Sequence, residues 1–328
     1  MREEDCILLG CVNTLASLIA IDLKKKEAFW YCPANILRVC GICYFDNSLF
    51  VASDNDLTKV NATGIHKTKI PGIYDNYAHS VKLFDESQLI IADTGNSCIH
   101  LFDGQNFNLS LSPLESWPTR PIDAIHLNDA LPFEGGFLVS AFSYQPFTAW
   151  KKTSYDWRRA GWGCLYHLQR FEHQTVSRIV SSGLECPHSL TAYQGEIYAC
   201  ASAAGDFISF ARQPNGLLTE KKRFHISDSH FLRGAMRYHD GWLLGGSSIR
   251  HGGGALGMQL YYLKDDGNCE LFWQGGSGEI YDIIAWKPEI MEAVCDVLEG
   301  APVITTEKDD YPCRCQLPKA YRVNFKQA

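Results

Sequence analysis

A two-strand unit that recurs along the chain constrains the fold more than any other feature of the sequence. Residues 88–103 (QLIIADTGNSCIHLFD) read as a strand, a turn at residues 93–96 and a second strand with alternating apolar residues. Asx and glycine residues suit the turn, and β-branched and aromatic residues suit a half-buried pleated surface. Residues 8–23 match this unit almost position by position, and looser copies lie at residues 49–60, 136–168, 196–210 and 242–263. Such repetition is typical of a β-propeller.

The junctions between copies predict the number of blades. A further short strand precedes the repeats, and its six openings contain Cys40, His79, His126, His188, Arg233 and Tyr281. Tight turns follow the first five openings, at residues 46–47, 85–87, 134–135, 194–195 and 240–241. The sixth opening has no repeat after it, whereas the N-terminal repeat has no opening before it.

Ring closure resolves this mismatch. Residues 280–286 would supply the innermost strand of a blade whose other strands lie in residues 6–32, which leaves no exposed sheet edge at the seam. We therefore predict an all-β, six-bladed propeller over residues 1–286, closed by pairing of N-terminal strands with a C-terminal innermost strand. Residues 287–328 would form an extension packed on the propeller, beginning with a short helix at residues 287–298.

Composition argues against several functions. The formal net charge of the 328 residues is −7 and no long basic run occurs, which argues against a nucleic-acid partner. The N-terminus lacks the pattern of a secretory signal, and no apolar segment approaches the length of a membrane span. Thirteen cysteines without such a signal indicate reduced thiols and a cytoplasmic location. The pair Cys40/Cys43 reads as core thiols, while Cys313/Cys315 leaves a metal or redox role open.

Three histidines form the strongest constellation. His79, His126 and His188 lie at strand openings, where the blades of a propeller converge on the central channel. Three imidazoles facing one channel mouth would suit Zn²⁺, Fe²⁺ or Mn²⁺. The alternative is that they bond main-chain carbonyls around a water-filled channel. Counted back from the following strand, Asn128 matches the position of His188 better than His126 does.

Other residues at the same openings are candidates for catalysis. Arg233 could bind an anionic group or form an ion pair with Asp282, and Tyr281 or Asp282 could move protons. Tyr281 could equally be a packed aromatic residue. Asn128 could contact substrate, or join Asp129 as an oxygen ligand for Ca²⁺.

Two insertions, at residues 142–162 and 247–257, are expected on the same face as the openings. Their aromatic and basic residues suit an anionic or sugar-like ligand, although a solvated loop with packed tryptophans is an equal alternative. The predicted substrate-binding residues in these insertions are Trp150, Arg158, Arg159, Trp162, Arg250 and His251. Residues 251–254 (HGGG) resemble an oxyanion-hole motif, but the chain has no G-x-S-x-G, and no nucleotide-binding loop occurs.

Two stretches resemble known propeller families. Residues 90–103 (IIADTGNSCIHLFD) resemble an NHL-type repeat, and residues 187–201 (PHSLTAYQGEIYACA) resemble a blade opening of that superfamily. One class within it, the peptidyl-hydroxyglycine amidating lyases, binds zinc through histidines at P-H-S-L openings. That resemblance implies a zinc role for His188 and, through AHSV, for His79.

Over residues 8–286 the order of HLND, a long loop, PHSL and an RG opening is similar to an uncharacterised bacterial family of six-bladed propellers, which implies the fold. Lactonase and strictosidine-synthase-like propellers are more distantly similar, and imply Ca²⁺ at Asn128 and Asp129.

These observations favour a metal-dependent lyase, hydrolase or isomerase that acts on a small polar or anionic substrate at the channel mouth. One alternative is a non-catalytic propeller that binds a protein or glycan partner. Another is a Ca²⁺-dependent, lactonase-like hydrolase.

Overall fold

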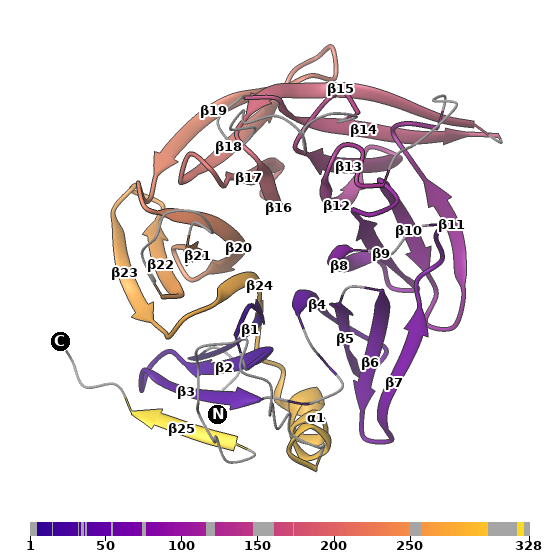
Figure 1. Cartoon of the computed structure of the whole chain (residues 1–328). Helices are drawn as coiled ribbons and strands as arrows, with labels where there is room; N and C mark the ends of the chain where they lie inside the picture. The colour runs from indigo at the N-terminus through magenta and orange to yellow at the C-terminus, as the bar shows by residue number, and fades with distance from the viewer. Residues whose placement is uncertain are drawn as a thin grey trace.

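The computed structural model describes residues 5–14, 16–31, 33, 36, 38–53, 55–73, 77–115, 122–146, 161–172, 174–248, 257–300 and the backbone of 320–324. In this part of the chain, six antiparallel sheets are arranged as a ring about a common centre (Figure 1). The predicted six-bladed β-propeller is confirmed.

Five sheets have four strands each, and in each of them the strands follow one another from the centre outwards in sequence order. The first contains β4 (Val39–Phe45), β5 (Ser48–Ser53), β6 (Asp56–Asn61) and β7 (Gly64–Lys69). The second contains β8 (Ala78–Asp85), β9 (Gln88–Asp93), β10 (Cys98–Phe102) and β11 (Phe107–Leu111). The third contains β12 (Leu127–Phe133), β13 (Gly136–Ala141), β14 (Gly163–Phe171) and β15 (Gln174–Leu184).

The fourth sheet contains β16 (Pro187–Tyr193), β17 (Glu196–Ala201), β18 (Asp206–Arg212) and β19 (Leu218–His225). The fifth contains β20 (His230–Tyr238), β21 (Gly241–Ser248), β22 (Gln259–Lys264) and β23 (Cys269–Gln274). The sixth is the closing blade, in the order β24 (Glu279–Ala285), β1 (Cys6–Val12), β2 (Leu18–Asp22), β3 (Glu27–Tyr31) and β25 (Ala320–Asn324).

The seam closes as the sequence predicted. Strand β24 pairs antiparallel with β1, with Ile7 opposite Ala285 and Leu9 opposite Ile283. The innermost strand of the last blade therefore comes from the C-terminal end of the repeats and its neighbours from the N-terminal end (Figure 1). Because no blade edge is left open at the seam, the ring is held by main-chain hydrogen bonds.

Two described elements that follow β24 lie against the first and last blades. Helix α1 (Pro288–Gly300) buries Met291 and Val294 in a core that includes Val39 and Leu49 of the first blade. Strand β25 pairs with β3 and adds a fifth strand to the closing sheet. No helix in the described part of the chain has the length and apolar character needed to cross a membrane.

The core lies between the blades, so middle strands are buried on both faces. All six residues of β5 are buried, as are all five residues of β10. Strand β19, the outermost of the fourth sheet, is largely exposed and contains Lys221 and Lys222, which discourages pairing with other chains. The ten cysteines that the structure describes, including Cys40 and Cys43, are thiols that form no disulfide with one another.

Two-residue turns connect strands within the blades. Asp46 and Asn47 have φ values of 48° and 50°, the left-handed conformation that matches the twist of a hairpin. The turn predicted at residues 240–241 instead lies at residues 239–240. Gly241 is already the first residue of β21, where a Cβ atom would lie 2.3 Å from the Leu263 carbonyl oxygen.

Candidate functional site at the central channel

The six innermost strands share an irregularity where they begin. Each has a register shift near its start, a β-bulge that redirects side chains toward the channel. The shift falls at Cys40, His79, Asn128 and Tyr281, and directly after His188 and Arg233. Asn128, two residues after His126, therefore occupies the bulge position equivalent to that of His79. Counted back from the following strand it matches His188, as the spacing predicted, although the shift of β16 falls directly after His188.

His126 nevertheless reaches the same region from the turn before β12. Its ring lies 5.2 Å from the ring of His79, edge to face, and 4.3 Å from the ring of Phe142. Phe142 in turn lies 5.0 Å from the ring of His188. The three predicted histidines are thus on one side of the channel, with Phe142 between His126 and His188.

The other side of the channel completes a closed ring of contacts. The His188 ring lies 5.4 Å from Phe231, and the Arg233 guanidinium lies over the rings of both Phe231 and Tyr281, at 4.5 and 4.1 Å. Tyr281 returns to His79 at 5.9 Å. We call these seven side chains the collar: His79, His126, Phe142, His188, Phe231, Arg233 and Tyr281.

Hydrogen bonds orient the three imidazoles in the same way. Nδ1 of His79 and of His188 each faces the carbonyl oxygen two residues earlier, at 2.8 and 3.0 Å. Nδ1 of His126 faces the carboxylate of Asp123 at 2.9 Å. Because these partners can only accept, each Nδ1 carries the proton, and Nε2 is the nitrogen at which each ring can present a lone pair.

His188 is the most constrained of the three. Its Nδ1 also lies 2.8 Å from the Ser202 hydroxyl, whereas its Nε2 is buried with no hydrogen-bond partner. Burial, followed by the nearby charges of Arg233 and the other two histidines, lowers the pKa of His188 well below its ordinary value. The ring is therefore neutral and offers a buried lone pair.

The spacing of the histidines is wider than that of a preformed metal site. Among the described residues, the group whose three ligand atoms all lie within 4.8 Å of one another is Asp93, Cys98 and His100. That cluster holds the turn between β9 and β10. His100 lies 3.2 Å from Asp93 through Nε2 and 2.7 Å from Ser110 through Nδ1, so its members satisfy one another.

Arg233 has a partner that the sequence did not indicate. Its guanidinium donates to the carboxylate of Glu279, and both side chains are buried. Asn13 donates to the other oxygen of the same carboxylate. The alternative that Arg233 pairs with Asp282 is therefore wrong. The positive charge of Arg233 is compensated by Glu279, which lies beside the collar.

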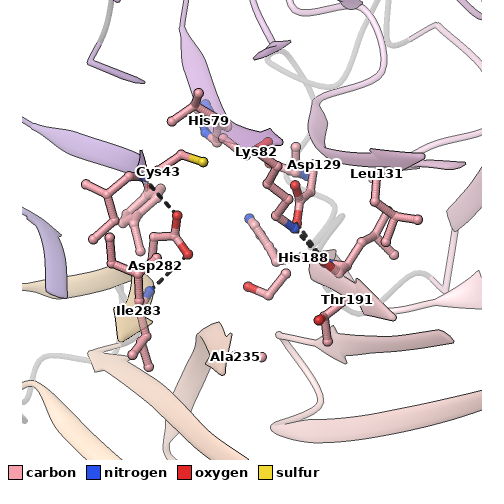
Figure 2. Close-up of a pocket in the computed structure, with 18 of the residues that line it drawn as sticks. Cys43, His79, Lys82, Asp129, Leu131, His188, Thr191, Ala235, Asp282 and Ile283 are labelled. Carbon is pink, nitrogen blue, oxygen red and sulfur yellow. Dashed lines mark hydrogen bonds and ion pairs between the residues drawn. The ribbon is translucent and has the colours of Figure 1, made fainter. Parts of the chain in front are cut away.

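Below the collar lies a cavity of about 450 Å³, lined by His79, Asn128, His188, Tyr281 and residues deeper in the channel. Figure 2 shows Lys82 and Asp129 on one wall and Asp282 on the opposite wall, with both acidic side chains facing inwards. Lys82 donates to Asp129 and to the Leu190 carbonyl oxygen. Sequence reasoning missed Lys82, whose position four residues into β8 carries no motif.

The two cavity aspartates occupy equivalent positions and join adjacent blades. Asp282 accepts a hydrogen bond from its neighbour Ile283 N and from Ile42 N of the next blade, both at 2.9 Å. Asp129 does the same with Ala130 N, at 2.8 Å, and Leu190 N, at 2.7 Å. Burial is the main reason that the pKa of Asp282 rises to about 7.

Several predicted binding residues are not in this arrangement. Trp162 is half-buried next to the start of β14 and does not line the cavity. The remaining five lie outside the described residues: Trp150, Arg158, Arg159, Arg250 and His251. Phe142 and Phe231 were not predicted, because an isolated phenylalanine beside a strand has no distinguishing pattern.

No protein-family model matches this sequence, and no curated protein matches it. The structure is similar to a protein of unknown function from Bacteroides caccae, with 12% identity over 85% of this chain and 97% of that one, at a TM-score of 0.60. It is also similar to a protein from Lactobacillus plantarum, with 11% identity over 83% of this chain and 82% of that one, at a TM-score of 0.53.

A third similar structure comes from Bacteroides uniformis and is provisionally assigned as a 6-phosphogluconolactonase. It is 11% identical over 82% of each chain, with a TM-score of 0.52. At such identities the likeness concerns the fold alone. By its own topology and by these likenesses, the chain is a six-bladed β-propeller.

Proposed function

We propose that this propeller is an enzyme that acts on a small polar molecule in the channel cavity, and that His79, His126 and His188 hold a divalent transition metal beside it. The observation that carries the proposal is the common orientation of the three imidazoles. Each has Nδ1 bound to an acceptor and its lone pair on Nε2, which is how protein histidines are oriented for metal binding.

The donor set fits Zn²⁺, Fe²⁺ or Mn²⁺, since neutral imidazole nitrogens are ligands for all three. The buried, unpartnered Nε2 of His188 also favours a ligand at this point. His188 is held by Ser202 and the Cys186 carbonyl, so the half-buried rings of His79 and His126 would turn toward it. When bound, such an ion supplies Lewis acidity.

Side chains around the cavity would transfer protons and orient the substrate. Asp282, whose pKa is near 7, is suited to accept or donate a proton at the cavity wall. Tyr281 lies against the Arg233 guanidinium and would orient substrate at the collar. The provisional lactonase assignment of the Bacteroides uniformis relative supports an enzyme at the level of this fold.

The calcium alternative is less favoured by the contacts. The Asp129 carboxylate already receives Lys82 Nζ and two backbone N–H groups, so a calcium ion would have to compete with these donors and with the Lys82 ammonium. A non-catalytic propeller that binds a partner through its insertions would instead leave the collar without a ligand.

Elemental analysis of the untagged full chain, before and after incubation with each ion, tests the proposal. Wild type should hold about one equivalent of a transition metal, as expected for one three-histidine site. His79→Ala and His188→Ala should lose it, while His66→Ala, an exposed histidine on β7, should retain it. Circular dichroism confirms folding. Absence of metal from wild type after reconstitution would rule out the histidine site.

A further inference from the structure

We propose that the channel cavity binds a small organic cation, a primary ammonium that also carries a hydroxyl group, with the ammonium at Asp282. The proposal deepens the proposed function by naming the class of substrate, and its catalytic meaning rests on that function. The cavity itself supplies three independent observations.

The first observation is an imbalance of charge. Among the described residues that line the cavity, the groups with an acidic or basic side chain of full charge when ionised are Lys82, Asp129 and Asp282, so two carboxyl groups face one ammonium. Lys82 is committed to the Asp129 wall, where it donates to that carboxylate and to the Leu190 carbonyl. One negative charge remains when Asp282 is ionised.

The second observation is the way in which Asp282 is held. Its two oxygens accept backbone N–H groups of Ile42 and Ile283, which are neutral donors, and its carboxyl group points into the cavity (Figure 2). An enclosed carboxylate of this kind is compensated either by a proton or by a bound cation. The raised pKa of Asp282 agrees with the first state, and a ligand ammonium would supply the second.

The third observation is an unused acceptor elsewhere in the cavity wall. The Asn128 side chain is 1% exposed; its Nδ2 donates to the His126 carbonyl oxygen at 2.9 Å, and its Oδ1 has no hydrogen-bond partner. A buried amide oxygen left unpaired costs free energy, so it favours a ligand with a hydroxyl donor. The Ser80 hydroxyl, 6% exposed, is also unpaired and lines the same cavity.

The walls between these polar groups are apolar. Leu131, Ala235 and Ile283 line the cavity and would contact the methylene groups of the ligand (Figure 2). A volume of about 450 Å³ is within the range of small-molecule sites. An anionic ligand could accept a hydrogen bond from the third N–H of Lys82. It would, however, lie near two carboxylates, and their repulsion disfavours an anion in this cavity.

Calorimetric titration of the metal-free full chain with 4-aminobutan-1-ol tests the proposal. Butan-1-ol and 4-hydroxybutanoate serve as matched ligands without the ammonium. The groups that face Asp282 are Lys82 of β8, Asp129 of β12 and Cys43 of β4, and the amine stays protonated between pH 6 and 8. Affinity should therefore follow ionisation of Asp282 and fall roughly tenfold from pH 8 to pH 6.

Single-residue variants test whether Asp282 is the residue that binds the ammonium group. Asp282→Asn should lose amine binding, and Asp228→Asn, an exposed aspartate with a 97% exposed side chain, should keep it. Lys82→Met should bind the amine more tightly, because it removes the competing cation. His188→Ala should bind the amine while losing metal, which separates failure of this proposal from failure of the metal site.

Three results would overturn the proposal: amine affinity that does not change with pH, binding of 4-hydroxybutanoate in preference to the amine, or unchanged binding in Asp282→Asn. If K⁺ displaces the proton of Asp282 and the amine has no effect, the site binds an inorganic cation, and this result would also refute the proposal. If Asp282→Asn does not fold, the pH dependence of wild type decides.

Discussion

The buried ion pair between Arg233 and Glu279 offers a sharp test of how the collar is held. Their side chains are 8% and 5% exposed, and Arg233 is also sandwiched between Phe231 and Tyr281. Replacing Arg233 by Met keeps most of the volume but removes the guanidinium donor and its positive charge from the Glu279 carboxylate. Removing one member of such a pair costs about 3–5 kcal/mol of stability.

Glu279→Leu should cost about the same, because it leaves an enclosed guanidinium without its carboxylate. In the double variant neither charge remains, and stability should fall by only about 1–2 kcal/mol beyond lost packing, since a hydrophobic pair can replace a buried ion pair. The two substitutions should therefore couple by at least about 3 kcal/mol, well above the error of a double-mutant cycle.

The free energy of unfolding would be measured by urea denaturation at pH 7, with two spectroscopic probes to establish that the transition is two-state. Unequal m-values would invalidate the cycle, so they must agree among the four proteins. Additive effects, or a Glu279→Leu cost below about 1 kcal/mol, would refute the buried pair. Arg233 would then be free to bind an anion, as the sequence alone suggested.

Three further predictions concern the channel and the outer strands. The pKa of Asp282 is raised in the folded protein, so its contribution to stability is complete below its unfolded pKa of about 3.9 and is lost as pH rises through about 7. The urea midpoint of wild type relative to that of Asp282→Asn should therefore fall from pH 5 to pH 8. A constant difference would contradict the raised pKa. Gly41→Ala should destabilise the fold by about 3 kcal/mol or more, because the new Cβ would lie 2.6 Å from Val81 N in the next blade. The control Gly195→Ala meets nothing within 4 Å but has a φ of 80°, so it should cost about 1 kcal/mol. Equal melting temperatures for the two variants would count against the blade packing. Deleting residues 320–328 should speed amide exchange in β3, which pairs with β25, and leave β11 of another blade unchanged; unaltered exchange in β3 would argue against the fifth strand.

Much of the fold is encoded locally and was therefore predictable. The alternation of apolar residues, the Asx and glycine turns and the repetition of the unit specify strands and hairpins within each blade. The unmatched opening at residues 280–286 and the unmatched repeat at the N-terminus required closure, which the pairing of β24 with β1 confirms. Counting back from the following strand also matched Asn128 with His188, and the register shifts lie at Asn128 and directly after His188.

The contacts within the channel depended on the tertiary structure. Whether His126 meets His79, or whether Arg233 pairs with Glu279 and not Asp282, is set by the bulges and by the rotation of one blade relative to the next. Lys82 became part of the site because its side chain crosses to Asp129 in the neighbouring blade, 47 positions along the chain. Sequence periodicity determines which face of a strand a residue occupies, whereas the partner of a side chain is decided by distances of a few ångströms between blades, and the sequence pattern carries no information about those distances.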